Sequence, residues 1–277
     1  MPHPPSNSIR LWRPAGVAGV ELVRARYRRQ SFARHVHEDY GLGVVEQGAL
    51  GFRYRGENLV ADPGAISLVI PGEAHDGHPA DSSGWAYRMF YVDAAVMGRM
   101  AEELAGKRSG LPYLSEGVLH DPALARTILC THQALESPET GRLEAESRLM
   151  AMMSGLLLRH AKPLPRPRRM GREHGAVRRA KEFIRERFAS DIALEDLAGA
   201  AGLSKFHLIR VFAKETGLSP HSFLMQVRAA RAKESIAAGL SPADAAIACG
   251  FFDQSHLTRH FRRFYGITPG FYRNSVL

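Results

Sequence analysis

Residues 202–212 read Gly-Leu-Ser-Lys-Phe-His-Leu-Ile-Arg-Val-Phe, and residues 250–261 read Gly-Phe-Phe-Asp-Gln-Ser-His-Leu-Thr-Arg-His-Phe. The residue types His, Leu, Arg, Phe, Gly and Pro then recur at equal spacing, from His207 to Pro220 and from His256 to Pro269. A repeat at a fixed offset indicates a duplicated structural unit. Each copy follows a short Ala-rich segment that ends in Gly, which predicts a helix, a tight turn and a second helix. The C-terminal part therefore predicts two helix-turn-helix units, and with them a DNA-binding module.

Capping residues indicate where these helices begin. Ser204 is suited to cap a helix over residues 205–216, and Asp253 to cap the second recognition helix. Ser241 followed by Pro242 predicts the start of the helix over residues 243–249, whereas Ala193 offers no capping hydroxyl to the corresponding helix of the first unit. A helix over residues 222–238, about 25 Å long, would hold the two recognition helices apart.

The faces of the two recognition helices divide into core and DNA-binding candidates. Leu208, Phe212, Leu257 and Phe261 are spaced to face the core. Arginine can pair with guanine or phosphate, glutamine with adenine, and isoleucine can touch a thymine methyl group. The predicted DNA-binding residues are Ser204, Lys205, Phe206, Ile209, Arg210, Gln254, Ser255, His256, Arg259 and Arg262. The candidates of the second unit, from Gln254 to Arg262, are more polar than those of the first. We therefore expect the two units to contribute unequally to DNA contact.

Positive charge follows the same division. Residues 1–160 contain 17 Lys and Arg against 18 Asp and Glu, residues 161–174 contain five against one, and residues 175–277 contain 15 against nine. The net charge of +9 therefore lies in the C-terminal part, as expected where a protein must neutralise phosphates. A charged surface that only keeps the protein soluble could also be basic. Because the positive charge coincides with the helical repeat, we favour a DNA-binding role for it.

The N-terminal part predicts a small β-barrel. Short β-branched or aromatic runs at residues 21–29, 42–46, 50–54, 65–70 and 86–92 are separated by Gly, Pro and Ser. Many short strands with such turns are typical of a barrel or jelly roll, whose mouth is a natural site for a small ligand. The predicted effector-binding residues are His35, His37, Tyr40, Glu73, His75 and Tyr87.

Two histidine segments stand out in this barrel. His35-Val-His37 and the run Pro71-Gly-Glu-Ala-His75 resemble the two sequence motifs of cupin barrels, but the glutamate that follows the second histidine in metal-binding cupins is absent here. His35, His37 and His75 could hold a divalent ion, with Glu73 as a fourth ligand. We expect instead that they hydrogen-bond the barrel or a ligand without metal, so no cofactor is predicted.

The middle of the chain predicts helices. Residues 122–135 follow Asp121 as an N-cap, and residues 143–160 carry a broad apolar face. These two helices could close the barrel core, form a dimer interface, or do both. We therefore predict a barrel at residues 1–95, a helical dimerisation pair at 96–160, a basic Pro-rich linker at 161–174 and the DNA-binding domain at 175–277, a multi-domain α+β architecture.

Residues 175–277 resemble the DNA-binding domain of AraC-type (arabinose-regulator) transcription factors. The resemblance rests on Gly202-Leu-Ser204, Leu208-x-Arg210-x-Phe212, Arg228, Ile247-Ala-x-x-Gly250-Phe251 and Phe261-x-x-x-Tyr265-Gly266, among others. The histidine segments are similar to the cupin-like effector domain of that family. The resemblance implies a homodimer that binds promoter DNA, responds to a small-molecule effector and contacts RNA polymerase, more often activating than repressing. Cys130 and Cys249 fit reduced core thiols and the N-terminus lacks a signal pattern, so we expect a cytoplasmic, nucleoid-associated protein.

Two alternatives compete with a ligand-responsive regulator. One is a cupin metalloenzyme fused to a DNA-targeting module, against which the missing glutamate argues. The other is a constitutive DNA binder whose barrel only dimerises. No apolar run approaches the ~20 residues that span a bilayer. We therefore expect neither catalytic activity nor a membrane partner.

Overall fold

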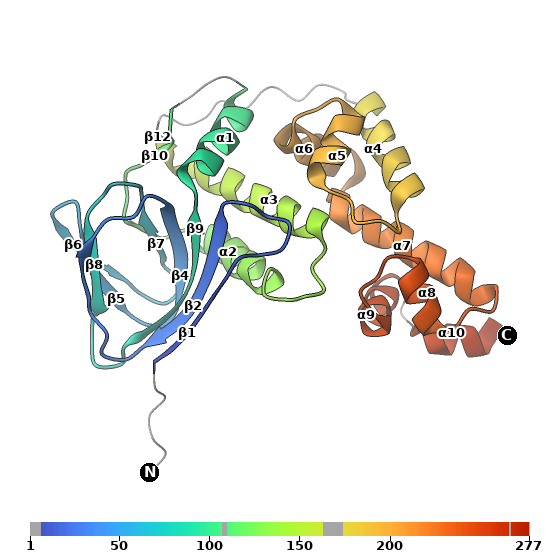
Figure 1. Cartoon of the computed structure of the whole chain (residues 1–277), viewed down its shortest axis with the longest axis horizontal. Helices are drawn as coiled ribbons and strands as arrows, with labels where there is room; N and C mark the ends of the chain where they lie inside the picture. Colours follow the sequence, from blue (N-terminus) through green and yellow to red (C-terminus); the bar gives the residue numbers. More distant parts are fainter. Residues whose placement is uncertain (1–6, 107–109, 163–173, 266, 277) are drawn as a thin grey trace, which may run out of the picture. The chain divides into compact units, whose positions relative to one another are not determined.

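The computed structural model describes residues 7–106, 110–162, 174–265 and 267–276. Contacts divide the chain into two units (Figure 1): residues 1–137 with 148–168, and residues 138–147 with 169–277. The first unit holds the strands and the second holds the helix-turn-helix repeat. An N-terminal β-rich domain followed by a helical domain confirms the predicted α+β architecture. Most of the predicted linker, residues 163–173, lies outside the described residues.

Antiparallel sheets form the first unit. The six-stranded sheet has the order β1-β2-β9-β4-β7-β11, and the four-stranded sheet has the order β3-β8-β5-β6. The strands of the first sheet are β1 (Ser8–Trp12), β2 (Val20–Tyr27), β9 (Trp85–Val92), β4 (Tyr40–Gly48), β7 (Ile66–Val69) and β11 (Val118–Leu119). Those of the second are β3 (Phe32–His35), β8 (His75–Pro79), β5 (Leu50–Tyr54) and β6 (Glu57–Ala61). A short pair joins β10 (Tyr113–Leu114) to β12 (Ala161–Lys162).

Strand β9 separates the inside of the first unit from its helical cover. Side chains alternate along a strand. Trp85, Tyr87 and Met89 pack in a core cluster with β2, whereas Phe90 contacts the His132 ring, with centroids 5.2 Å apart. His132 belongs to helix α2 (Pro122–Ala134), which packs on β4 and β9. The interior of the sheets therefore faces one side of β9 and the helix the other.

Two further helices belong wholly or partly to this unit. Helix α1 (Ala94–Ala105) begins at Asp93, whose carboxylate accepts hydrogen bonds from the Ala95 and Val96 amides. Helix α3 (Arg142–His160) crosses the division between units, and its residues after Ser147 belong to the first unit. The predicted N-cap of α2 is confirmed, because Asp121 accepts a hydrogen bond from the Leu124 amide.

A buried charge network joins β9 to α2. Arg88 is only 4% exposed and pairs with Glu46 at 3.0 Å and with Glu136 at 2.7 Å. Its Nη1 also donates to His132 Nδ1, 3.1 Å away, and His132 Nε2 donates to the Val23 carbonyl at 3.2 Å. A buried guanidinium is tolerated only when it is paired in this way. The network therefore ties the helix to the outer face of the sheet.

Among the described residues, seven helices form most of the second unit. They are α4 (His174–Arg187), α5 (Leu194–Ala201), α6 (Lys205–Thr216), α7 (Pro220–Ala237), α8 (Pro242–Ala248), α9 (Gln254–Tyr265) and α10 (Pro269–Val276). The pairs α5–α6 and α8–α9 are the two predicted helix-turn-helix units, and α7 is the predicted connecting helix. Leu208, Phe212, Leu257 and Phe261 are fully buried, as predicted from their spacing.

Local capping places the recognition helices as predicted. Ser204 accepts from the His207 amide, Asp253 from the His256 amide and Ser241 from the Asp244 amide. Ala193 gives α5 no side-chain cap, and the Leu194 amide donates instead to Glu146. Gly250, in the turn of the second unit, has φ 78°, and an added Cβ would lie 2.6 Å from the Ala189 carbonyl oxygen, so glycine is required there.

Arg228 of α7 closes the core of the second unit. Its guanidinium is buried and donates to the Phe188 carbonyl at 2.6 Å and to the Ser190 carbonyl at 2.9 Å. These carbonyls follow the end of α4 and carry no charge. Burial lowers the pKa of Arg228 to about 10, which still leaves the side chain protonated at neutral pH. Arg228 is therefore a structural residue that fixes α7 against the end of α4.

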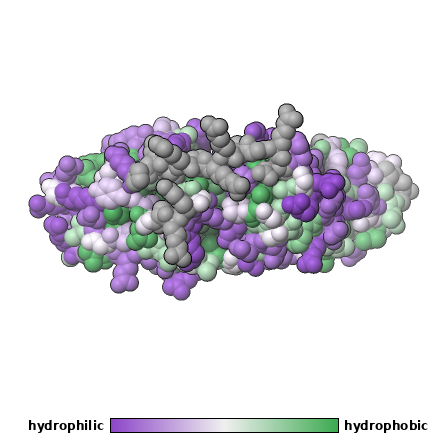
Figure 2. All heavy atoms as spheres, turned by 90° about the horizontal axis from the view of Figure 1, so that it is seen from above, coloured by the Kyte–Doolittle hydropathy of each residue, from purple (hydrophilic) through white to green (hydrophobic). Residues whose placement is uncertain are grey.

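Hydrophilic and hydrophobic residues are interspersed over the face drawn in Figure 2. No helix among the described residues combines the length and apolarity needed to cross a membrane. Both cysteines are free thiols. Cys249 is buried, whereas Cys130 is exposed on α2, on the face of the helix turned away from Leu124 and Ile128.

We expect Arg88→Ala to lower the free energy of unfolding by about 3–5 kcal/mol, because it removes the buried cation that Glu46 and Glu136 share and leaves Glu136 with only the exposed Arg10 and Arg24. Urea denaturation followed by circular dichroism measures the change. Arg13→Ala is the matched control, since the Arg13–Glu21 pair is exposed and should contribute at most about 1 kcal/mol. Equal effects of the two substitutions would contradict a structural role for the network.

We expect the stability of the first unit to fall between pH 6.5 and 4. Burial, with Arg88 as a second cause, lowers the pKa of His132 from 6.5 to about 4. The unfolded chain therefore binds a proton in this window that the folded chain excludes, so stability is full above pH 6.5 and declines as pH falls. When the pH is lowered from 7 to 5, the free energy of unfolding of His132→Gln should fall by about 2 kcal/mol less than that of the wild type. Urea denaturation of both proteins at the two pH values measures this. An equal fall in the free energy of unfolding of variant and wild type would contradict it.

Candidate effector pocket and DNA-binding surface

A cavity of about 270 Å³ lies between the two sheets of the first unit. Residues of β2 and β9 line it on one side and residues of β3, β5 and β8 on the other. Aromatic side chains supply much of its wall, namely Tyr27, Phe32, Phe52, Trp85, Tyr87 and Tyr91. No Lys or Arg occurs among the described residues that line it. The cavity suits a small, flat molecule with polar groups.

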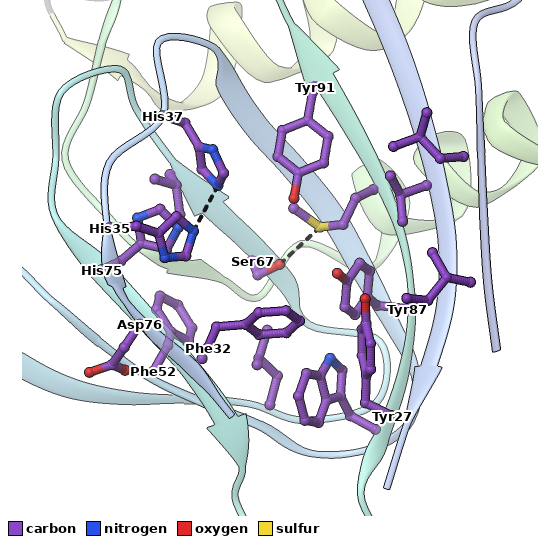
Figure 3. A pocket seen from close by; sticks show the side chains of 18 residues that line it. Tyr27, Phe32, His35, His37, Phe52, Ser67, His75, Asp76, Tyr87 and Tyr91 are labelled. Carbon is purple, nitrogen blue, oxygen red and sulfur yellow. Dashed lines mark hydrogen bonds between the residues drawn. The ribbon is translucent and has the colours of Figure 1, made fainter. Parts of the chain in front are cut away.

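Three histidines gather at one side of this cavity (Figure 3). His35 ends β3 and His75 begins β8, and the two are register partners across the strand pair. His37 lies two residues beyond His35, with its ring centroid 4.7 Å from that of His35 and 4.9 Å from that of His75. The structure thus brings together the three imidazoles that sequence spacing had placed in two separate segments.

Burial keeps the inner members of this cluster neutral. It lowers the pKa of His37 to about 4, and the neighbouring His75 and His35 lower it further. Burial likewise lowers the pKa of His75, against the opposing effect of a hydrogen bond to the Glu73 carbonyl. At neutral pH these two side chains are therefore uncharged imidazoles, able to offer a nitrogen lone pair to a ligand.

Phenol and indole groups from β2 and β9 supply donors to the cavity, with the Tyr91 ring next to that of His37. Burial raises the pKa of Tyr91 to about 12 and that of Tyr27 and Tyr87 above the usual range, so all three hydroxyls keep their protons. A hydrogen bond links Tyr27 and Tyr87. The Trp85 Nε1 donor is buried and has no hydrogen-bond partner among the described residues. An unpaired buried donor is costly, so it is suited to meet an acceptor on a ligand.

Four of the six predicted effector residues line the cavity: His35, His37, His75 and Tyr87. The other two, Tyr40 and Glu73, do not line it. Tyr40 is 1% exposed and donates its hydroxyl hydrogen to the Pro112 carbonyl, because it points to the opposite side of β4 from the cavity. Glu73 pairs with Arg55 at 3.0 Å. Sequence reasoning missed Tyr27, Phe32, Ser67 and Trp85, which only the strand register brings to the cavity.

Helix α9 presents a polar face in the second unit. A surface hollow is lined by Gln254, Ser255, Thr258, Arg259 and Arg262, four of them predicted DNA-binding residues. Within this unit Arg259 forms an ion pair with Glu139. The hydrogen-bonding groups of the helix N-terminus and two guanidinium groups therefore share one surface, as expected for a helix that enters a major groove.

His256 does not share that face. It is 6% exposed, contacts the rings of Phe251 and His260, and accepts a hydrogen bond from the Phe252 amide. Our prediction that it faces outward is wrong, because the buried stripe of α9 includes the position before Leu257. His256 packs the turn against the helix.

Helix α6 presents a less polar face. Ser204, Ile209, Lys205 and Arg210 are at least partly accessible, and Lys205 pairs with Glu195 at 2.9 Å. The prediction that Phe206 faces outward is wrong, since it is 4% exposed, and the Arg210 guanidinium lies over its ring at 5.2 Å. The Arg210 Nη1 atom is buried without a hydrogen-bond partner among the described residues. Phe206 therefore supports Arg210.

Comparison with known families matches both units. Residues 17–153 match the AraC-like ligand binding domain, and residues 197–275 match a helix-turn-helix domain. The first match covers every strand that lines the cavity except β1. The second covers α6 and α9.

Relatives and solved structures extend these matches. The HTH-type transcriptional regulator YbfI of Bacillus subtilis is 31% identical over 238 residues, which is 86% of each chain. The HTH-type transcriptional activator RhaS of Klebsiella pneumoniae is 25% identical over 262 residues, which is 92% of each chain. A probable AraC family regulator from Rhodopseudomonas palustris is 27% identical, with a TM-score of 0.35, over 36% of this chain and 96% of that one.

Proposed function

Because the chain belongs to the AraC family of transcriptional regulators, we propose that the cavity of the first unit binds a small polar metabolite that controls DNA binding by α6 and α9. The observation that carries the proposal is the cavity itself. Neutral imidazoles, protonated phenols and an unpaired indole donor converge on about 270 Å³ of space within the region that matches a ligand-binding domain.

DNA contact is assigned to eight residues with accessible side chains on α6 and α9, or in the turn before α6. They are Ser204, Lys205, Ile209, Arg210, Gln254, Ser255, Arg259 and Arg262. The polar hollow on α9 supports hydrogen bonding to base edges, with Arg259 directed to guanine or phosphate and Gln254 to adenine. Ser204 and Lys205 are better placed for phosphate, because they lie at a helix N-terminus.

The finer features of this proposal rest on similarity to related proteins. RhaS is named as an activator, which supports activation and therefore contact with RNA polymerase for this chain as well. We assign dimer formation to the helices of the first unit, and location to the cytoplasm, where promoter DNA is found. The proposal gives the chain no catalytic role, in line with relatives that are named as regulators.

Arg259→Ala should weaken binding to the operator by about 5- to 150-fold, because loss of a bidentate base contact costs about 1–3 kcal/mol. Selection of binding sites from random DNA identifies the operator, and gel-shift titration measures the affinity. Arg178→Ala, on an exposed position of α4, removes the same charge and is the control. It should alter specific and non-specific binding alike, by a few-fold at most. Unchanged affinity together with unchanged base preference in Arg259→Ala would remove this residue from the DNA interface.

A metabolite that binds the cavity should raise the melting temperature of the full-length protein and alter its occupancy of the operator. Sugars, amino acids and small aromatic acids are the compounds to screen. For such a compound, Tyr87→Phe should weaken binding by about 2- to 13-fold, the effect of losing one hydrogen bond. Tyr113→Phe is the control, because Tyr113 is exposed and lies outside the cavity. Operator occupancy that no compound changes would favour a constitutive DNA binder.

A further inference from the structure

The three histidines of the cavity have the geometry of a metal site. One nitrogen from each of His35, His37 and His75 lies within 4.8 Å of the others, and the His35 and His37 Nε2 atoms are 3.2 Å apart. Two ligands on one ion with bonds of about 2.1 Å lie roughly 3.0–3.4 Å apart. The His35–His37 pair already has this spacing, and the His75 nitrogen lies within 4.8 Å of both.

Backbone carbonyls orient two of the three rings. His35 Nδ1 lies 2.7 Å from the Ala33 carbonyl oxygen, and His75 Nδ1 lies 3.1 Å from the Glu73 carbonyl oxygen. A carbonyl only accepts, so each Nδ1 carries the hydrogen and each Nε2 is left with a free lone pair. Metal-binding histidines are held in this manner, with the non-ligating nitrogen donating to a carbonyl or carboxylate.

The third ring needs only a change of tautomer. Since His35 Nε2 is an acceptor, the 3.2 Å contact requires that His37 Nε2 donates its hydrogen. When an ion binds His37 Nε2, that proton moves to His37 Nδ1 through solvent, and no charge is lost from the ring. The contact between two nitrogens is thereby replaced by two bonds to one ion.

Nearby carboxylates are engaged elsewhere. Asp76 lines the cavity but accepts a hydrogen bond from the Arg53 amide at 2.7 Å, and Glu73 pairs with Arg55. The donor set is therefore three imidazoles, which suits Zn²⁺, Co²⁺, Ni²⁺ or Fe²⁺ rather than Mg²⁺ or Ca²⁺. An ion held by neutral ligands keeps its full charge, in a cavity whose described lining offers neither Lys nor Arg.

We infer that His35, His37 and His75 bind one divalent transition-metal ion, and that a coordination position facing the cavity binds an anionic oxygen of the effector. The first part needs nothing beyond the histidine geometry. The second part rests on the proposed function, because it makes the ion the cation that recognises a carboxylate or similar group. The Ser67 and Tyr91 side chains, which line the same cavity in Figure 3, lie where they can orient such a ligand.

Metal binding is tested on the full-length protein after removal of bound ions with a chelator. We expect one Co²⁺ or Zn²⁺ per chain by mass spectrometry and calorimetry, visible Co²⁺ absorption bands and a higher melting temperature. His75→Gln and His37→Gln should each weaken binding by roughly 100-fold or more, since loss of a direct ligand costs at least as much as loss of an outer partner. His78→Gln is the control, because His78 shares β8 with His75 but does not line the cavity.

Circular dichroism spectra and melting curves of the metal-free variants that match those of the metal-free wild type show that each variant is folded. Equal Co²⁺ affinity in wild type and His75→Gln would overturn the metal site, as would the lack of any bound Co²⁺ in the wild type. Azide and acetate then probe the open position, and each should shift the Co²⁺ bands of the wild type. Unshifted bands would overturn the second part only. No step uses an effector or DNA, so failure of the proposed regulation would leave the metal result standing.

Discussion

The alternation of side chains along β9 is the constraint on which the first unit depends. Tyr87, Met89 and Tyr91 face the cavity, while Arg88 and Phe90 between them face α2. β9 pairs with β2 on one side and with β4 on the other, so its register sets the inward face of both neighbours. A slip by one residue would turn Arg88 into an apolar cavity and Tyr87 toward the helix. The ion pairs of Arg88 therefore specify the register as well as holding the helix.

The chemical character of the cavity follows from this alternation of side chains and from the pairing of the strands. Apolar and aromatic residues of the six-stranded sheet form one wall, and the histidines enter from the four-stranded sheet opposite. His35 and His75 meet because β3 and β8 pair in register, although forty residues of chain separate them. The Nδ1 atoms of His35 and His75, which would be costly to bury without a partner, donate to backbone carbonyls. The free nitrogens of these rings are left for whatever enters the cavity.

Features that depend on neighbours in sequence were predictable, and features that depend on register were not. Ser204, Asp253 and Asp121 cap their helices as expected, because a cap involves only the next three residues. β8 was not among the predicted strands, since its sequence His-Asp-Gly-His-Pro contains Asp, Gly and Pro, which are depleted in strands. Tyr40 was predicted to bind the effector, but it is 1% exposed and donates its hydroxyl hydrogen to the Pro112 carbonyl outside the cavity.

The recognition helices show the same distinction at finer scale. Two apolar residues four apart gave the core-facing side of each helix correctly, yet the buried stripe is wider than two residues. Phe206 and His256 lie at its edge, where helices packed alongside decide whether a side chain is covered. Their burial sharpens the inequality of the two copies. In α6 the Arg210 guanidinium packs on the ring of the buried Phe206. In α9 the side chains of Gln254, Ser255 and two arginines line one surface hollow. The two copies share the same helical scaffold, and the accessible polar side chains are concentrated on the second copy.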